Sequence, residues 1–480
     1  MFINREKELT VLNGLLAQDV AQFVMVYGRR RVGKTTLLNE WAKRTGLSTF
    51  YWVAKRDPRE LQMASLAQAI FAWQQGVEFS DVEMRPGSWE SVFRQLAQAI
   101  GQQRVIVILD ELPYILQQDS GFGTHLQAAW DHLFKSTQVV FLISGSHIGM
   151  LTALTEYHAP LYGRLTAQFP LDPLTFSESR AFLPHYDAQQ RLAAHAVLGG
   201  VPAYLERWRS QETIASNIEK LFLQRTSWFR TEPLVLISDL TQRETAVYEA
   251  ILRAIADGKH GREEIAKAAA VKSPSLSHYF ERLLALRLLE RRIPATVPLN
   301  KLKNSKQTRY FLRDPFLRFY YRFVDQNLHL IERGLARRLW QMVGDNFRAF
   351  VAYSFEEIAY EWVIHQANQG ILPFLPDNVG QHWSKTVQVD VVAIAWREKQ
   401  LLLGECTWGD RPLGRSVVSE LVERKTPRVL ANLPDGGEGW TIHYALFARS
   451  EFTEPARQSA EQHEMWLLTL EQLDVDLRSV

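Results

Sequence analysis

The chain has 480 residues, which suggests about three domains. Its 55 basic and 53 acidic side chains give a net charge of +2, which excludes a uniformly polybasic protein and leaves room only for local basic patches. The single cysteine, Cys406, excludes an intramolecular disulfide. The first residues are charged and no apolar run approaches the roughly 18 to 20 residues that cross a bilayer, so we expect a cytoplasmic protein with no membrane partner.

Residues 1–170 alternate between strand and helix patterns. Strands are predicted at 23–27, 49–53, 105–109 and 139–143, and helices at 35–44, 61–75 and 89–101. The runs 105–109 and 139–143 are apolar throughout, which is typical of strands buried on both faces. Alternating βα units of this kind predict an α/β fold with a parallel sheet flanked by helices. Residues 171–238 follow as a mainly helical segment.

The pattern between 239 and 330 differs from both. Helices are predicted at 241–256, 263–270 and 275–286, followed by strand, turn and strand at 289–293, 298–306 and 308–312. This order predicts a winged helix-turn-helix. Polar side chains at the start of the third helix and a basic hairpin favour contact with double-stranded DNA: Ser275, Ser277, His278, Arg291, Arg292, Lys301, Lys303, Lys306 and Arg309. The alternative is that these lysines only keep an exposed hairpin soluble.

A further α/β domain is expected at 340–480. Its predicted elements are a helix at 347–366, a strand pair at 387–396 and 400–405, a helix at 416–425 that stops before Pro427, and a strand at 440–448. Another helix and a short strand follow.

A phosphate-binding loop stands between the first strand and the first core helix. The segment Gly28-Arg29-Arg30-Arg31-Val32-Gly33-Lys34-Thr35 fits the pattern Gly-x4-Gly-Lys-[Ser/Thr]. The glycines let backbone N–H groups converge on phosphates, Lys34 reaches the β- and γ-phosphates, and the Thr35 hydroxyl is a ligand for Mg²⁺. We therefore expect residues 28–35, with Thr36, to bind ATP. The three arginines are either solvated loop charges or contacts to phosphate or a neighbouring subunit.

Two carboxylates follow the buried run 105–109. Asp110 is placed to hold the Mg²⁺ shell together with Thr35, and Glu111 to polarise the attacking water. A second carboxylate directly after the aspartate favours ATP hydrolysis over nucleotide binding alone.

The sequence resembles the archaeal-type ATPases of the AAA+/STAND group of P-loop proteins. The resemblance rests on the arginine-filled phosphate loop and on four further segments: residues 2–9, 142–146 (LISGS), 160–164 (PLYGR) and 199–202 (GGVP). It implies that residues 2–9 pack near the adenine, that Ser144 or Ser146 is a sensor residue, and that Arg164 stabilises transition-state charge in cis or in trans. It also implies a helical lid at 171–238 whose Pro202 contacts the nucleotide.

The same resemblance implies a C-terminal domain of the PD-(D/E)XK, restriction-endonuclease-like fold. The matching carboxylates are Glu356, Asp390 and Glu405, a possible second metal site. That motif has a lysine where this sequence has Thr407, and Lys385 or Arg411 would have to supply the missing cation. Both an active nuclease and an inactive nuclease-like domain therefore stay open, while Cys406 is expected to be packed.

These expectations describe a P-loop ATPase with a helical lid, a winged helix and a nuclease-like domain, in which ATP and Mg²⁺ control action on DNA. The alternative is a STAND-type regulatory switch that binds a protein partner, with the winged helix as an interaction module. The sequence leaves the oligomeric state open.

Overall fold

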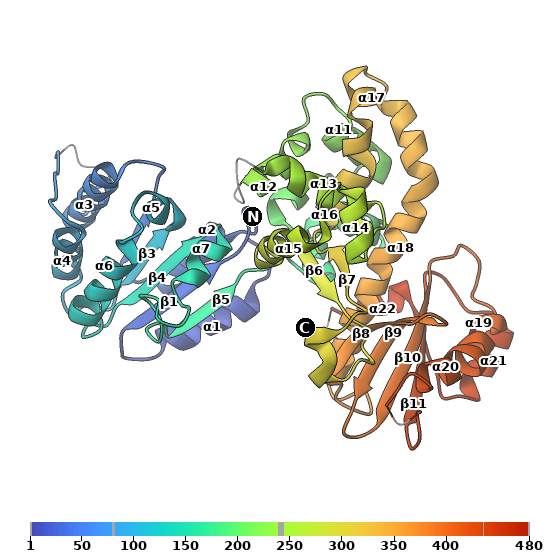
Figure 1. The fold of residues 1–480 in the computed structure, drawn as a ribbon. Coiled ribbons are helices and arrows are strands. Elements are labelled where there is room, and N and C mark those ends of the chain that lie inside the picture. Colours follow the sequence, from blue (N-terminus) through green and yellow to red (C-terminus); the bar gives the residue numbers. More distant parts are fainter. Residues whose placement is uncertain (1, 79–81, 239–243, 435, 479–480) are drawn as a thin grey trace. The chain divides into compact units, whose positions relative to one another are not determined.

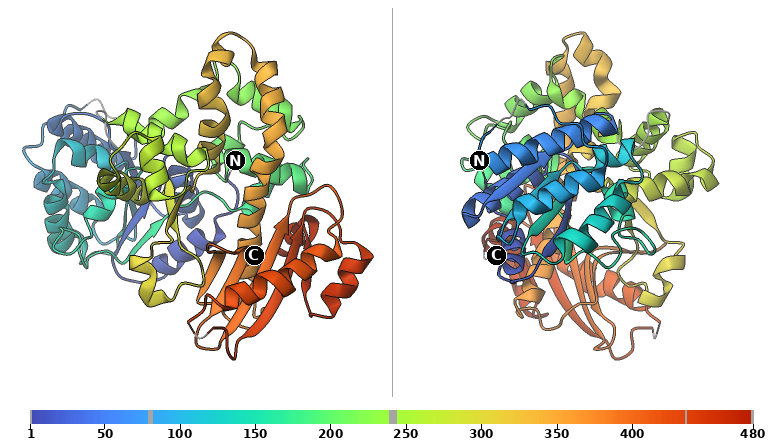
Figure 2. Two further views of the ribbon diagram at one scale, coloured as in Figure 1. Left: turned by 45° about the vertical axis from the view of Figure 1, so that its right-hand side comes forward. Right: turned by 90° about the vertical axis from the view of Figure 1, so that its left-hand side faces the viewer.

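The computed structural model describes residues 2–78, 82–238, 244–434 and 436–478, and it divides into two compact units. The first unit contains Met1–Pro173 with Val201–Ala203, and the second contains Leu174–Gly200 with Tyr204–Val480. Figures 1 and 2 colour both units along the chain. Over the described ranges, no helix is both long enough and apolar enough to cross a membrane.

A five-stranded parallel sheet forms the centre of the first unit, in the order β2-β3-β4-β1-β5. The strands are β1 (Gln22–Tyr27), β2 (Thr49–Val53), β3 (Ile106–Asp110), β4 (Val140–Gly145) and β5 (Ala167–Pro170). The first four lie where the sequence predicts strands. The fifth was not predicted, because its four residues are only partly buried and carry no apolar run.

Helices cover both faces of this sheet (Figure 1). One face packs against α1 (Glu6–Leu16) and α2 (Lys34–Thr45). The other face packs against α3 (Arg59–Gln75), α4 (Trp89–Ile100), α5 (Pro113–Gln118), α6 (Phe122–Ala129) and α7 (Ile148–Ala153). Because parallel strands end at one edge, the residues after β1, β3 and β4 meet there.

The second unit begins with short helices. They are α8 (Phe176–Ser179), α9 (Ala188–Leu198), α11 (Ile214–Phe222) and α12 (Glu232–Ser238), while α10 (Pro202–Leu205) begins in the first unit and ends in the second. Next come α13 (Thr245–Ala256), α14 (Arg262–Ala268) and α15 (Leu276–Ala285). Strands β6 (Leu289–Arg292) and β7 (Arg309–Leu312) then form an antiparallel pair, and a 3₁₀ helix, η5 (Leu299–Asn304), lies in the loop between them. Residues 241–243 of the predicted helix at 241–256 lie outside the described residues.

A long helix links this hairpin to the C-terminal sheet. After α16 (Pro315–Phe319) and α17 (Leu328–Glu332), α18 runs from Ala336 to Asn368, well beyond the helix predicted at 347–366. It packs along β8, β9 and β10 of that sheet (Figure 2).

The C-terminal sheet has five strands in the order β12-β11-β10-β9-β8. The strands are β8 (Asn378–Trp383), β9 (Gln388–Ala395), β10 (Gln400–Thr407), β11 (Thr441–Ala448) and β12 (Trp466–Thr469). Strands β8, β9 and β10 are antiparallel, and β10, β11 and β12 are parallel. The predicted strand pair at 387–396 and 400–405 is thus confirmed, while β8 was not predicted. Helices α21 (Glu454–Glu461) and α22 (Leu470–Asp476) flank β12.

The prediction that the helix at 416–425 stops before Pro427 is wrong. Helix α19 (Arg415–Ser419) continues as a π-helical turn, η8 (Glu420–Lys425), and then as α20 (Thr426–Leu430). Pro427 is the second residue of α20 and directly follows the π-helical turn. The wider π turn lets the chain pass the proline without a break.

Candidate functional site

The phosphate loop joins β1 to α2, as predicted, and its glycines are required by its surroundings. Gly33 caps α2 with a φ of 93°. A Cβ atom on Gly28 would lie 2.4 Å from the carbonyl oxygen of Leu171, so no other residue fits there. The buried Arg5 donates to the carbonyl of Val32 at 2.9 Å. The loop is therefore held between the N-terminal segment and the end of β5.

Lys34 is almost fully buried, and its ammonium group lies on the loop itself. Its Nζ donates to the carbonyl oxygens of Gly28 at 2.8 Å and Arg29 at 3.2 Å. A nucleotide phosphate bound in the loop would be close enough to replace these carbonyl oxygens as the hydrogen-bond partner of Lys34. Arg30 donates to the hydroxyl of Tyr114 at 3.3 Å, and Thr36 is exposed in the first turn of α2.

Asp110, at the end of β3, gathers four hydrogen-bond donors. It accepts from Thr35 Oγ1 at 2.6 Å, from the Tyr51 hydroxyl at 2.8 Å, from the Glu111 N–H at 2.9 Å and from Ser144 Oγ. The side chains predicted to hold Mg²⁺, Thr35 and Asp110, thus lie in contact. Their hydroxyl and carboxylate oxygens are the ligands that Mg²⁺ prefers, so the residues present fit this ion.

Tyr51 was not predicted. It stands on β2, the strand beside β3, and points its hydroxyl at Asp110. Burial and the charge of Asp110 raise the pKa of Tyr51 well above its usual value, so the hydroxyl keeps its proton and stays a donor. The signal in the sequence was an aromatic residue near the end of a neighbouring predicted strand.

Glu111 turns away from Asp110 toward β4. Its φ is 53°, an uncommon left-handed conformation for a glutamate, and its carboxylate accepts from the N–H of Ser146 at 3.2 Å and from Ser146 Oγ at 3.0 Å. The sequence left open whether Ser144 or Ser146 serves this site. In the structure each serine contacts a different carboxylate: Ser144 contacts Asp110, and Ser146 contacts Glu111.

Arg164 is paired elsewhere in the first unit. Its guanidinium donates to both carboxylate oxygens of Asp131 at 2.8 to 3.1 Å and to the carbonyls of Pro160 and Tyr162. Within the described residues, no recorded contact joins Arg164 to the group around Asp110. A role in ATP hydrolysis stays a prediction, and it would require this ion pair to open.

Pro202 lies beside the phosphate loop, with its Cγ atom 4.0 Å from the Cβ position of Gly33. It belongs to the first unit, whereas the chain on both sides of Val201–Ala203 belongs to the second. Nearby in sequence, Leu171 donates to the carbonyl of Tyr27 at 2.6 Å, while Leu174 donates to the carbonyl of Gly200 at 2.8 Å. A Cβ atom on Gly200 would overlap the Leu174 carbonyl, so glycine is required there.

The three carboxylates predicted in the C-terminal domain sit in a partly buried group. Glu356 accepts from Gln381 at 2.7 Å, Asp390 accepts from the Cys406 N–H at 3.1 Å, and Glu405 pairs with Lys425 at 2.6 Å. Burial and the charge of Asp390 raise the pKa of Glu356 to about 8 and that of Glu405 to about 7.

The donor set for a second metal is incomplete. In the part of the chain that the structure describes, no group of three or more His, Cys, Asp or Glu side chains converges as a metal site. Glu405 Oε1 is nevertheless buried and has no hydrogen-bond partner there. The cation beside Glu405 is Lys425 on η8, which the sequence analysis missed, whereas the suggested Lys385 and Arg411 are exposed.

The basic side chains of the β6–β7 hairpin divide into two sets. Lys301, Lys303 and Lys306 are exposed in the connecting loop. Arg292 points inward, where it pairs with Glu357 at 3.1 Å and lies over the rings of Phe311 and Tyr353. Of the residues predicted to meet DNA, Arg292 is therefore a packing residue.

Comparison with known proteins agrees with this site. Residues 2–207 match the model of a family described as an ATPase domain predominantly from Archaea, and residues 320–422 match a family of archaeal and bacterial proteins of unknown function. The first unit, with its parallel sheet and phosphate loop, thus resembles a P-loop ATPase domain over residues 2–207.

Relatives cover most of the chain. An uncharacterized protein of Methanocaldococcus jannaschii is 28% identical over 411 residues, which are 85% of this chain and 88% of that protein. Among solved structures, a Walker-type ATPase of Pyrococcus abyssi has 21% identity and a TM-score of 0.49, covering 67% of this chain and 96% of that one. The ORC2 protein of Aeropyrum pernix, solved with ADPNP and ADP, has 16% identity and a TM-score of 0.42, covering 70% and 93%.

Proposed function

We propose that the first unit hydrolyses ATP with Mg²⁺ and that the nucleotide state controls the second unit, which acts on DNA. The observation that carries the first part is the group of Thr35, Asp110 and Glu111, assembled directly beside the phosphate loop. Mg²⁺ would supply charge neutralisation on the phosphates, with Thr35 and Asp110 holding it.

The protein side chains have separate tasks in this reaction. Lys34 moves its hydrogen bonds from the loop carbonyls to the phosphates and stabilises the charge that develops on them. Glu111 orients the attacking water, and Ser146 fixes the direction of its carboxylate. Tyr51 and Ser144 keep Asp110 in place from the neighbouring strands.

The chain itself supports coupling between the units. Leu171 is bonded to the strand that ends at the phosphate loop, and Leu174, only a few residues later, is bonded to Gly200 of the second unit. Pro202 then returns to the side of Gly33. A movement of the phosphate loop on ATP binding would therefore pull on both connections to the second unit.

The substitution Glu111→Gln tests hydrolysis. It keeps the shape and the hydrogen bonds to Ser146 but removes the carboxylate charge, so ATP should still bind while turnover falls by about a hundredfold or more. Glu60→Gln, at an exposed position on α3, is the matched control and should keep full turnover. Equal turnover in Glu111→Gln and the unmodified protein would contradict the proposal.

Hydrogen exchange tests the coupling. Protection of residues 174–238 and 244–330 should differ between Glu111→Gln held with ATP and the same protein held with ADP. Identical protection in the two states would contradict nucleotide control.

Contact with DNA is supported by the order α13-α14-α15-β6-β7, which is that of a winged helix, and by the exposed lysines of the hairpin loop. Anisotropy of a labelled duplex at about 0.15 M salt, with ATP, with ADP and without nucleotide, measures it. Absence of binding in every state would favour the alternative, a STAND-type switch with a protein partner.

A second candidate activity is metal-dependent cleavage of DNA by the C-terminal domain, as in the PD-(D/E)XK fold. The observation that favours it is Lys425 at Glu405, a cation beside a carboxylate group. Cleavage with Mg²⁺ or Mn²⁺ that is lost in Asp390→Ala would support it, and absence of cleavage would leave an inactive nuclease-like domain.

A further inference from the structure

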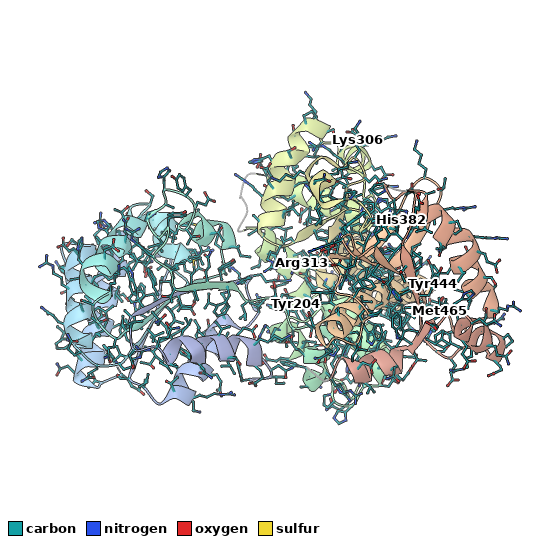
Figure 3. The ribbon with its side chains drawn as sticks, turned by 90° about the horizontal axis from the view of Figure 1, so that it is seen from below. Tyr204, Lys306, Arg313, His382, Tyr444 and Met465 are labelled. Atoms are coloured by element: carbon teal, nitrogen blue, oxygen red, sulfur yellow. The ribbon has the colours of Figure 1, made fainter. Side chains whose placement is uncertain are left out.

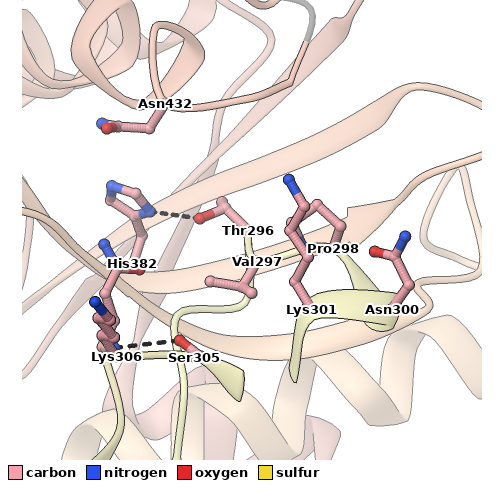
Figure 4. A pocket seen from close by; sticks show the side chains of 10 residues that line it. Thr296, Val297, Pro298, Asn300, Lys301, Ser305, Lys306, His382 and Asn432 are labelled. Atoms are coloured by element: carbon pink, nitrogen blue, oxygen red, sulfur yellow. Dashed lines mark hydrogen bonds between the residues drawn. The ribbon is translucent and has the colours of Figure 1, made fainter. Parts of the chain in front are cut away.

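A pocket of 470 Å³ lies in the second unit between the β6–β7 loop and the C-terminal sheet. Thr296, Lys301 and Lys306 line it from the loop, His382 from β8, and Asn432 from the residues after α20 (Figure 4). Figure 3 places Lys306 and His382 within the unit. Its volume is that of a site for a small organic ligand and exceeds what a lone inorganic ion would fill.

The walls of this pocket are fixed, because the loop is attached to β8 at both ends. Ala295 donates to the carbonyl of Gln381 at 2.8 Å, and the indole of Trp383 donates to the carbonyl of Gln307 at 3.1 Å. Arg309 lies 4.7 Å from the centre of the Trp383 ring. A preformed pocket loses little entropy when a ligand enters.

His382 lines this pocket and carries a polar atom without a recorded partner in the described residues. The residue is 2% exposed, and its Nδ1 lies 2.6 Å from Thr296 Oγ1 (Figure 4). Its Nε2 is buried and has no hydrogen-bond partner among residues 2–78, 82–238, 244–434 and 436–478. Burial lowers the pKa of His382 to about 4, so the ring is neutral near pH 7. A buried ring nitrogen without a partner in a native protein calls for a ligand or water atom.

The positive charge at the rim of the pocket favours an anionic ligand. Lys301 and Lys306 are exposed at its rim, no described carboxylate lines it, and neither lysine forms a recorded ion pair in the described ranges. A phosphate monoester carries about −1.5 to −2 at pH 7, which two ammonium groups balance. The amides of Asn300 and Asn432 and the hydroxyl of Ser305 add donors and acceptors of the kind that read a base or a sugar.

We propose that this pocket binds a nucleotide, with its phosphate at Lys301 and Lys306 and its base or sugar against His382 and Asn432. The nucleotide is either free or the 5′-terminal unit of a nucleic-acid strand, since both present the same groups. This site is separate from the phosphate loop, and the proposal does not rest on ATP hydrolysis.

Binding to the 480-residue chain tests it with two probes at about 0.15 M salt. Thymidine 5′-monophosphate, followed by calorimetry, represents the free nucleotide. A 5′-phosphorylated tetrathymidylate with a 3′ fluorophore, followed by anisotropy, represents a strand. At least one probe should bind, and thymidine without phosphate should bind at least tenfold more weakly than its monophosphate. A tetrathymidylate that binds at least tenfold more tightly than the monophosphate identifies a strand, and equal affinities identify a free nucleotide.

Variants of the protein distinguish binding in this pocket from non-specific attraction of the probes to surface lysines. The double variant Lys301→Ala/Lys306→Ala should weaken binding at least tenfold. Thr296→Val removes the hydrogen bond that orients the His382 ring and should weaken binding severalfold. Lys303→Ala, in the same loop but outside the pocket lining, should change it less than twofold. Lys34→Ala should leave thymidylate binding unchanged. No binding of either probe, or an equal loss in Lys303→Ala and in the double variant, would overturn the proposal.

Discussion

The ammonium group of Lys425 lies 2.6 Å from Glu405, and so brings a positive charge to the carboxylate group from a helical turn rather than from β10. The strand itself carries Thr407 at the place where the nuclease-like motif has lysine. In the proposed nuclease activity, the cation would thus come from Lys425 on another element.

Lys425→Ala should abolish any DNA cleavage, by about a hundredfold or more, because a cation that stabilises developing phosphate charge is lost. Binding of Mn²⁺ at pH 7 is a second readout, since Glu405 loses both a competing ammonium group and the charge that favours its ionised form. Arg424→Ala, at the exposed neighbouring position, is the control and should keep both properties. Cleavage that persists in Lys425→Ala would show that the ion pair is only structural.

Tyr51→Phe should lower the rate of ATP hydrolysis by about fivefold to fiftyfold, because it removes one donor to Asp110 while keeping the ring. Stability should change little, since the phenyl ring fills the same space. Steady-state turnover measured over a range of Mg²⁺ concentrations checks this. An unchanged rate at every concentration would mean that Thr35 and Ser144 suffice to hold Asp110.

Arg164→Ala and Asp131→Ala break the same ion pair from its two ends. If the guanidinium stabilises transition-state charge, Arg164→Ala should reduce turnover by about a hundredfold or more, whereas Asp131→Ala should retain it. Each should cost the first unit about 1 kcal/mol in urea unfolding, since the pair is partly exposed. Equal turnover in both variants would assign Arg164 a structural role alone.

Glu361→Gln should flatten the dependence of stability on pH. Burial raises the pKa of Glu361 to about 8, with Glu357 and Glu178 adding to the effect. The folded protein therefore binds this proton more tightly than the unfolded chain, and the resulting stability is lost as pH rises from about 5 through about 8. Between pH 6 and pH 9 the unmodified protein should lose about 1 to 3 kcal/mol more than the variant. Glu461→Gln, at an exposed position on α21, should follow the unmodified protein in urea titrations.

Asp474→Ala should destabilise the second unit by about 3 to 5 kcal/mol, because it leaves the buried Arg191 without its carboxylate partner. Asp474 is 3% exposed and also contacts Arg180 and Arg478. Arg478→Ala removes a more exposed member of the group and should cost no more than about 1 kcal/mol. Similar losses in the two variants, measured by urea unfolding, would contradict this ranking.

The clearest predictions were the strands buried on both faces, since a short, continuous apolar run such as Val139–Ile143 is typical of a strand in the middle of a parallel sheet. Strands β5 and β8 were not predicted, because they are partly exposed and mix polar with apolar residues. The helix past Pro427 was missed because a proline usually ends a helix, and a π turn before it has no clear signature in sequence.

The residues of the functional site also divide into those that the sequence predicted and those that it did not. Gly28, Lys34 and Thr35 were predictable because the phosphate loop is contiguous, and Asp110 because it follows a recognisable strand. Tyr51, Lys425 and the pairing of Arg164 with Asp131 depend on which elements become neighbours in three dimensions. No local pattern records those contacts, so they required the structure.

The bond between Arg191 and Asp474 joins residues 283 positions apart. During synthesis at about 5 to 20 residues per second, α9 would wait roughly 15 to 60 seconds for the carboxylate that neutralises its buried arginine. Most of the first unit is contiguous and precedes α9, so it can fold on the ribosome in that interval. The second unit instead reaches its native state only after the last helix emerges. A ribosome that stalls or terminates early would therefore release a folded first unit attached to an unfinished second unit, a natural substrate for chaperones and proteases.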